Sequence, residues 1–218
     1  MLLQPVSIKF CRYKVDEYCR DSKSYLELLD RWKSENYNAS TSNKLTLVAA
    51  DVQALYPSVR RDLVEAGVRE ALTLCTEYSK TVVDTLVNLT MYCLENVVVQ
   101  NGEKFYNQTE GIITGDNHSV SIANITLHHI MLPIADALNK ACLFKRYIDD
   151  IIWISEGEDH AEMLQNVLLR TFRENGLHLT FRKITTNEPN MSLEFLDVNH
   201  VIDIRCPGGF YFLWHRFH

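Results

Sequence analysis

The chain has 218 residues, of which 46% are hydrophobic and 23% are charged. These proportions are typical of a soluble globular protein, and they exclude a collagen-like or low-complexity chain. No apolar run approaches the ~20 residues of a membrane-spanning helix, and the N-terminus lacks the basic start and long apolar stretch of a secretory signal. The net charge of −6 is opposite in sign to the basic surface that nucleic-acid-binding proteins usually present.

The six cysteines form no C-x-x-C pair and lie mostly within apolar segments. We therefore expect reduced, mostly buried thiols in an intracellular protein. Near the C-terminus, the spacing of Cys206, His215 and His218 does not fit a zinc finger.

The first elements are a helix and a buried strand. A helix is expected over 22–35, where apolar residues recur at a spacing of three to four. A polar loop follows, and then the segment KLTLVAADV predicts a buried strand over 44–52 that runs up to Asp51. Pro57 ends this extended region.

The middle of the chain combines helices with a hairpin. Helices are expected over 60–78 and 80–94. Two β-rich runs flank Asn101-Gly102, which is the strongest short signal for a β-hairpin. A glycine-containing turn then leads into a helix over 117–131.

The last third predicts a second hairpin, with Asp149-Asp150 as its turn, and then a helix and strands. The helix is expected over 159–175, and the three strands over 177–184, 192–202 and 209–215. This order of elements predicts an α+β fold, with helices on one face of a largely antiparallel sheet.

Two acidic clusters at strand ends predict a metal site. Asp149 and Asp150 lie side by side between apolar strand residues, and Asp51 ends a separate apolar strand. Buried like charges repel one another, and a divalent cation is the simplest compensation. Mg²⁺ prefers carboxylate oxygens together with substrate phosphates. The alternative is that each acid is an ordinary solvated turn or strand-end residue.

These segments resemble the motifs of reverse transcriptases, in the same order and over roughly residues 44–204. Asp51, followed by Tyr56, looks like motif A, and YIDD at 147–150 looks like motif C. Between them, YNQTEGIITGDNHSVSIANI resembles motif B, although the family commonly has a small-residue and proline run after the second glycine. The segment SLEFLDVNHVI resembles motif E, and DVQALYPSV, RYIDDI and FLDV are most similar to Penelope-like retroelements, which are relatives of telomerase.

The resemblance implies the palm domain of a right-hand polymerase fold, with fingers and thumb largely missing. Residues 1–43 would be partial fingers or an N-terminal helical segment, 44–204 the palm, and 205–218 the start of a thumb or a C-terminal strand. For the fingers residues that grip the triphosphate, Lys9, Arg12 and Lys14 are weak candidates.

The implied activity is RNA-directed DNA polymerisation by two-metal nucleotidyl transfer to a primer 3′-hydroxyl. Asp51 and Asp149 would hold two Mg²⁺ ions directly, with Mn²⁺ as an alternative, and Asp150 would assist. The partners would be an RNA template, a DNA primer and dNTPs, with no membrane, and the enzyme would act in the nucleus.

The resemblance also implies nucleotide-binding roles. Tyr56 would lie under the sugar and exclude a 2′-hydroxyl, and Gln108, Gly111 and Gly115 would shape the floor beneath template and nucleotide. Lys183 would donate a proton to the leaving pyrophosphate. For each residue a structural role is the alternative: a core tyrosine, ordinary turn glycines and a surface strand lysine.

The basic pair Lys145 and Arg146 either contacts the nucleic-acid backbone or lies on a solvated strand edge. Two other functions remain open. One is a catalytically inactive or domesticated palm that binds nucleic acid or another partner. The other is an RNA-dependent RNA polymerase, which Tyr56 disfavours because such enzymes need room for the ribose hydroxyl.

Overall fold

The computed structural model describes residues 17–36, 45–116, 118–185, 191–201 and 211–213. These residues form two compact units. The helical unit contains 54–133 and 171–178, and the sheet unit is drawn from 16–53, 134–170 and 179–218.

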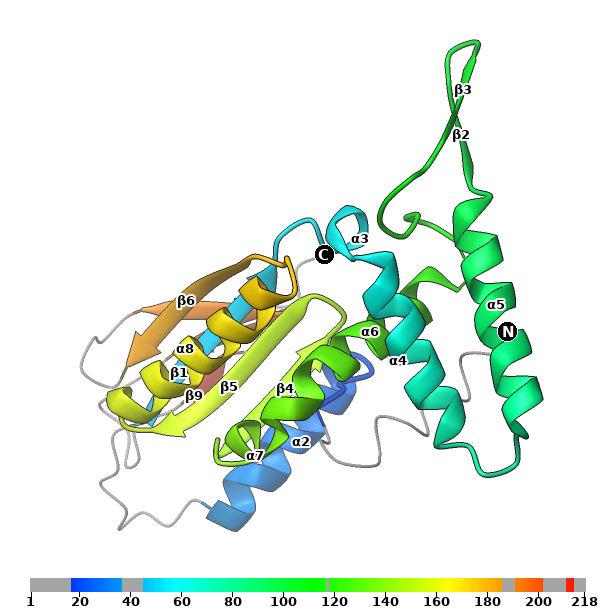
Figure 1. Ribbon diagram of the computed structural model, residues 1–218. Helices are drawn as coiled ribbons and strands as arrows, with labels where there is room; N and C mark the ends of the chain where they lie inside the picture. The colour runs from blue at the N-terminus through cyan, green and yellow to red at the C-terminus, as the bar shows by residue number, and fades with distance from the viewer. Residues whose placement is uncertain (1–16, 37–44, 117, 186–190, 202–210, 214–218) are drawn as a thin grey trace. The chain divides into compact units, whose positions relative to one another are not determined.

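The sheet unit is built on a four-stranded antiparallel sheet with the strand order β4-β5-β1-β6 (Figure 1). The strands are β1 (Leu45–Val52), β4 (Leu143–Tyr147), β5 (Asp150–Glu156) and β6 (Leu179–Thr185). The central strand β1 is buried along nearly its whole length, as its apolar sequence predicts. The antiparallel α+β class is therefore confirmed.

Helices cover both faces of this sheet. On one face, α2 (Ser22–Asn36) places Tyr25 and Leu29 in a buried cluster with Leu47 and other residues of β1 and β5. On the other face, α8 (Glu158–Glu174) runs along the sheet, next to Phe181 of β6. We predicted helices on one face only, whereas the structure has helices on both faces. The reason is that strands with apolar side chains on both sides need a packing partner on both sides.

A second, three-stranded antiparallel sheet belongs to the same unit, in the order β7-β8-β9. Its strands are β7 (Ser192–Phe195), β8 (Val198–Val201) and β9 (Tyr211–Leu213). The single strand predicted over 192–202 is thus a hairpin. Its turn contains Leu196 at φ 54°, and the sequence lacks the glycine or asparagine that usually marks such a turn.

The helical unit contains α3 (Leu55–Ser58), α4 (Arg61–Thr73), α5 (Lys80–Glu95) and α6 (Ser119–Met131). Gly67 of α4 lies against α6, where an added Cβ would be 3.2 Å from the Cβ of His129. The glycine therefore allows the two helices to approach closely.

The predicted hairpin at Asn101-Gly102 is present in the same unit. Its strands are β2 (Val98–Asn101) and β3 (Lys104–Asn107), and Gly102 has a φ of 63°. The hairpin extends from the end of α5 (Figure 1). The side chains of both strands are exposed. Two short helical segments follow α6 along the chain: η1 (Leu132–Ile134) and α7 (Ala135–Leu138), of which α7 belongs to the sheet unit.

Within the described ranges no helix is both long and apolar enough to cross a lipid bilayer. Four cysteines in these ranges are free thiols, as expected: Cys19, Cys75, Cys93 and Cys142. The expectation that they are mostly buried is wrong for this part of the chain, because only Cys19 is buried, whereas Cys75 and Cys142 are half-buried and Cys93 is exposed. The candidate fingers residues Lys9, Arg12 and Lys14, and the C-terminal residues Cys206, His215 and His218, lie outside the described residues.

Candidate active site

Strand pairing brings the two acidic clusters together. Strands β1 and β5 are antiparallel neighbours, and their register places Asp51 directly opposite Asp150. Residues paired in this way have Cα atoms about 4.5–5.5 Å apart and side chains on the same face of the sheet. Two carboxylates that lie 99 residues apart in the chain (150 minus 51) therefore meet at one end of the sheet.

Asp149 lies in the turn that joins β4 to β5. Tyr147 pairs with Asp150, so the turn residues are Ile148 and Asp149. The backbone N–H of Val52 donates a hydrogen bond of 3.1 Å to the carbonyl oxygen of Asp149, which ties the turn to the end of β1. The turn predicted at Asp149-Asp150 is thus one residue earlier, because Asp150 already pairs within the sheet.

The electrostatics of the site disfavour three simultaneous negative charges. Burial raises the pKa of Asp150 to about 6, and Asp149 and Asp51 add to this effect, whereas Arg182 opposes it. The pKa of Asp149 is raised as well, chiefly by burial and then by the charge of Asp51. A cation at this end of the sheet would therefore relieve a repulsion that the fold maintains.

The donor set of this site is made of carboxylate oxygens, which suit a hard divalent cation. As the side chains stand, the described residues contain no group of three or more His, Cys, Asp or Glu arranged to hold a metal ion. One Asp51 oxygen accepts a hydrogen bond of 3.2 Å from the side-chain amide of Gln53, which also lies 3.3 Å from the hydroxyl of Thr180.

Arg146 and Lys145 are both buried, so neither predicted environment, a nucleic-acid backbone or a solvated strand edge, is correct. The Arg146 side chain is fully buried, and its guanidinium forms an ion pair of 3.1 Å with the equally buried Glu17. It also donates a hydrogen bond of 2.9 Å to the carbonyl oxygen of Ile148. The sequence offered no signal for this role, because Glu17 is distant along the chain.

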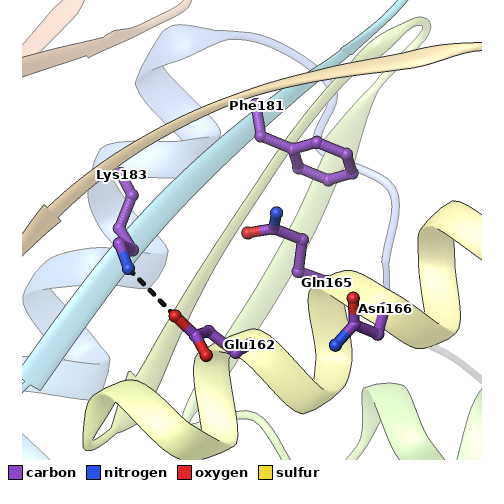
Figure 2. A pocket seen from close by; sticks show the side chains of 5 residues that line it. All are labelled: Glu162, Gln165, Asn166, Phe181 and Lys183. Atoms are coloured by element: carbon purple, nitrogen blue, oxygen red, sulfur yellow. Dashed lines mark hydrogen bonds and ion pairs between the residues drawn. The ribbon is translucent and has the colours of Figure 1, made fainter.

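The structure does not bring Lys183 together with the three aspartates. In the register of β6 with β1, Lys183 is opposite Val48, whereas Asp51 is opposite Thr180. Three residues of strand correspond to about 10 Å, and an odd offset puts the two side chains on opposite faces. The ammonium group instead contacts Glu158 and Glu162 of α8, and these hydrogen bonds raise the pKa of Lys183. Figure 2 shows the contact with Glu162.

In the helical unit, two predicted nucleotide-binding residues are in direct contact. The backbone N–H of Ile112 donates a hydrogen bond of 2.7 Å to the carbonyl oxygen of Tyr56. The neighbouring Gly111 has a φ of 74°, and a Cβ added there would lie 2.6 Å from the same Tyr56 oxygen and 2.7 Å from the Cα of Pro57. Only glycine fits this close approach between the two segments.

Gln108 and Gly115 occupy turns of the same unit. The carbonyl oxygen of Gln108 accepts a hydrogen bond of 2.6 Å from Arg61, which also donates to the carbonyl oxygen of Leu94 at 2.8 Å. Arg61 therefore joins the end of α5 to the segment that follows the hairpin, a role that its surface-like sequence context did not indicate. Gly115 has a φ of 95° with open space around it. Glycine is therefore favoured at this position by the backbone conformation and not by close packing.

Comparison with known proteins covers most of the chain. The sequence profile of the reverse transcriptase (RNA-dependent DNA polymerase) family matches residues 13–200. No curated protein matches the chain.

Solved telomerase structures share the fold. Apo telomerase from Candida tropicalis, truncated from its C-terminal domain, is 13% identical with a TM-score of 0.72, over 92% of this chain and 42% of that one. The telomerases of Candida tropicalis and Candida albicans, each in complex with a TWJ fragment of telomeric RNA, are 14% and 12% identical with TM-scores of 0.74. Both matches cover 91% of this chain and 35% of the telomerase, so the chain spans well under half the length of these proteins.

Proposed function

This chain belongs to the reverse transcriptase family, and from that premise we propose that it is the catalytic palm of an RNA-directed DNA polymerase from a Penelope-like retroelement. The reaction would be attack of a primer 3′-hydroxyl on the α-phosphorus of a dNTP, with pyrophosphate as the leaving group. The α+β fold with an antiparallel palm sheet, shared with telomerases, supports this proposal.

The observation that carries this proposal is the register that sets Asp51 opposite Asp150, together with the hydrogen bond that ties Asp149 to the end of β1. These carboxylates would hold two Mg²⁺ ions, or Mn²⁺ in their place, with Asp51 and Asp149 as the direct ligands. The ions would lower the pKa of the attacking hydroxyl and stabilise the charge of the phosphoryl group. The protein would contribute the fixed spacing of its strands and a partly buried environment.

The residues of the helical unit would select and support the nucleotide. Tyr56 would contact the sugar and exclude a 2′-hydroxyl, and its support by Gly111 favours a fixed position. Gln108 and Gly115 would shape the floor beneath the template and the base. The ion pairs of Lys183 with Glu158 and Glu162 leave the proposed proton donation to pyrophosphate the least supported of these roles.

The proposed partners are an RNA template, a DNA primer and dNTPs, and the proposed location is the nucleus. The Candida telomerases seen with telomeric RNA share this fold, which supports an RNA template. The net charge of −6 indicates that electrostatic attraction to a primer–template would be weak for this chain alone.

A second function, a catalytically inactive palm that serves as a binding scaffold, is favoured by two observations. These are the acidic net charge and the lack, within the described part of the chain, of a ready-made group of three metal-binding side chains. The raised pKa values of Asp149 and Asp150 argue the other way, because a scaffold gains nothing from half-buried, repelling carboxylates.

Primer extension decides between the two functions. The assay uses poly(rA)/oligo(dT) with dTTP and Mg²⁺, and compares the natural chain with Asp149→Ala and with the matched control Asp136→Ala on the exposed surface of α7. We expect incorporation by the natural chain and the control, and background levels from Asp149→Ala. Incorporation that is equal in all three would contradict the proposed function, and so would incorporation in none, even with flanking segments added.

A further inference from the structure

The turn that carries Asp149 has a backbone conformation that its own sequence does not favour. Ile148 has a φ of 52°, in the left-handed region. A β-branched side chain rarely adopts this conformation, and two-residue hairpin turns usually use asparagine or glycine there. Such an outlier persists only when the surrounding structure holds it in place.

The Arg146 side chain contacts this turn from within the fold. One guanidinium nitrogen donates to the carbonyl oxygen of Ile148 at 2.9 Å, and another lies 3.1 Å from a carboxylate oxygen of Glu17. Both side chains are fully buried. The planar guanidinium can hold two acceptors in fixed directions, which a flexible ammonium group cannot do as well.

The backbone reinforces this arrangement. The N–H of Arg146 donates to the carbonyl oxygen of Glu17 at 2.6 Å, and the N–H of Cys19 donates to the carbonyl oxygen of Arg146 at 2.7 Å. The short segment at Glu17 thus pairs along the outer edge of β4, and the carboxylate of Glu17 reaches the guanidinium from a fixed position.

From these contacts we propose that Arg146, anchored by Glu17, is a positioning residue that holds the Ile148–Asp149 turn so that the Asp149 carboxylate remains at the metal-binding end of the sheet. This inference rests on the proposed function. Replacing a buried ion pair by neutral groups often changes the stability of a protein little. The proposal therefore assigns the Glu17–Arg146 pair a role in metal affinity and not in stability alone.

The test is a double variant, Glu17→Gln with Arg146→Met, in the 218-residue chain. It removes both charges of this ion pair together. The matched control is Arg69→Met with Asp84→Asn, which removes an ion pair between α4 and α5. Two readouts apply: amide hydrogen exchange of Val52, whose N–H bonds to Asp149, against Val48 within β1, and the affinity for Mn²⁺ by electron paramagnetic resonance.

We expect the double variant to lose protection at Val52 while Val48 stays protected, and to bind Mn²⁺ about tenfold more weakly, as is usual when a residue that orients a ligand is removed. The control should change neither value. Protection at Val52 and Mn²⁺ affinity equal to those of the natural chain would overturn the inference. If Val48 also loses protection in the double variant, the single variant Glu17→Gln is measured instead. The same two results, for Val52 exchange and for Mn²⁺ affinity, then support or overturn the inference.

The two proposals fail in different ways. If Asp149→Ala abolishes primer extension but the double variant keeps its Val52 protection and Mn²⁺ affinity, the positioning role is wrong and the polymerase function stands. If Asp149→Ala extends primers as well as the natural chain does, the polymerase function is wrong, and Val52 exchange still decides whether Arg146 holds the turn.

Discussion

The hydroxyl group of Tyr25 lies 2.8 Å from Nε2 of His200, and this contact joins α2 to β8 in the buried interior of the sheet unit. The other ring nitrogen, Nδ1, lies 3.0 Å from the carbonyl oxygen of Leu193. A carbonyl oxygen only accepts, so Nδ1 carries the proton and Nε2 accepts from the tyrosine hydroxyl. Both partners are neutral here: burial lowers the pKa of His200 to about 4 and raises the pKa of Tyr25 well above its usual range.

This pair predicts an acid-sensitive fold. The folded chain binds a proton at His200 less tightly than the unfolded chain does, where the pKa is near 6.5. The contribution of His200 to the free energy of unfolding is therefore complete above pH 6.5. It is lost as the pH falls towards 4, by roughly 3 kcal/mol in all. Urea unfolding at pH 7 and pH 4.5 measures this loss. His200→Gln should be less stable at pH 7 and less sensitive to pH, whereas the exposed His178→Asn should behave like the natural chain.

Gly111→Ala and Gly115→Ala form a matched pair, because both glycines have positive φ but only Gly111 is crowded. The Cβ added at position 111 would overlap the backbone of Tyr56 and Pro57, so we expect a loss of roughly 3 kcal/mol in the free energy of unfolding. At position 115 only the backbone conformation opposes the change, at about 1 kcal/mol. Urea denaturation measures both values. Equal losses in the two variants would show that the contact between Gly111 and Tyr56 is not close.

Tyr56→Ala tests the proposed exclusion of the 2′-hydroxyl. Removing the ring should leave room for ribose, and the ratio of kcat/KM for UTP to that for dTTP should rise by about tenfold or more. Single-nucleotide extension on an RNA template measures the two values. Tyr106→Ala, at an exposed tyrosine of β3, is the control and should leave the ratio unchanged. An unchanged ratio in Tyr56→Ala would show that another residue reads the sugar.

Asp150→Asn tests whether the charge of Asp150 destabilises the fold in the absence of a metal ion and contributes to Mg²⁺ binding. The raised pKa of Asp150 means that its ionised form destabilises the fold, and this penalty grows as the pH rises from 3.8 towards 6. In EDTA at pH 8 the variant should therefore be more stable than the natural chain, by about 1 kcal/mol once solvent screening is considered. Adding Mg²⁺ should raise the Tm of the natural chain, and it should raise that of the variant by less, because Asp51 and Asp149 remain as direct ligands. Thermal unfolding in both buffers measures this, and a variant that is less stable in EDTA would contradict the prediction.

Local pattern alone was enough to predict most elements of this protein. The apolar spacing in α2, the continuous apolar run of β1 and the Asn101-Gly102 turn each encode their structure within a few residues, because helix and strand periodicity and turn chemistry are local properties. The acidic residues at strand ends are also a local signal, since each interrupts or ends an apolar run, and the sequence by itself therefore identifies Asp51, Asp149 and Asp150 as candidates.

Only the tertiary structure decided how these parts meet. The register that sets Asp51 opposite Asp150, the burial of Arg146 against Glu17 and the coverage of the sheet by α2 and α8 depend on contacts between distant segments. No window of sequence contains both partners of such a contact, so local periodicity cannot specify it. The turn at Ile148 has the same origin, because its strained conformation is held by a side chain and a neighbouring strand rather than by its own residues.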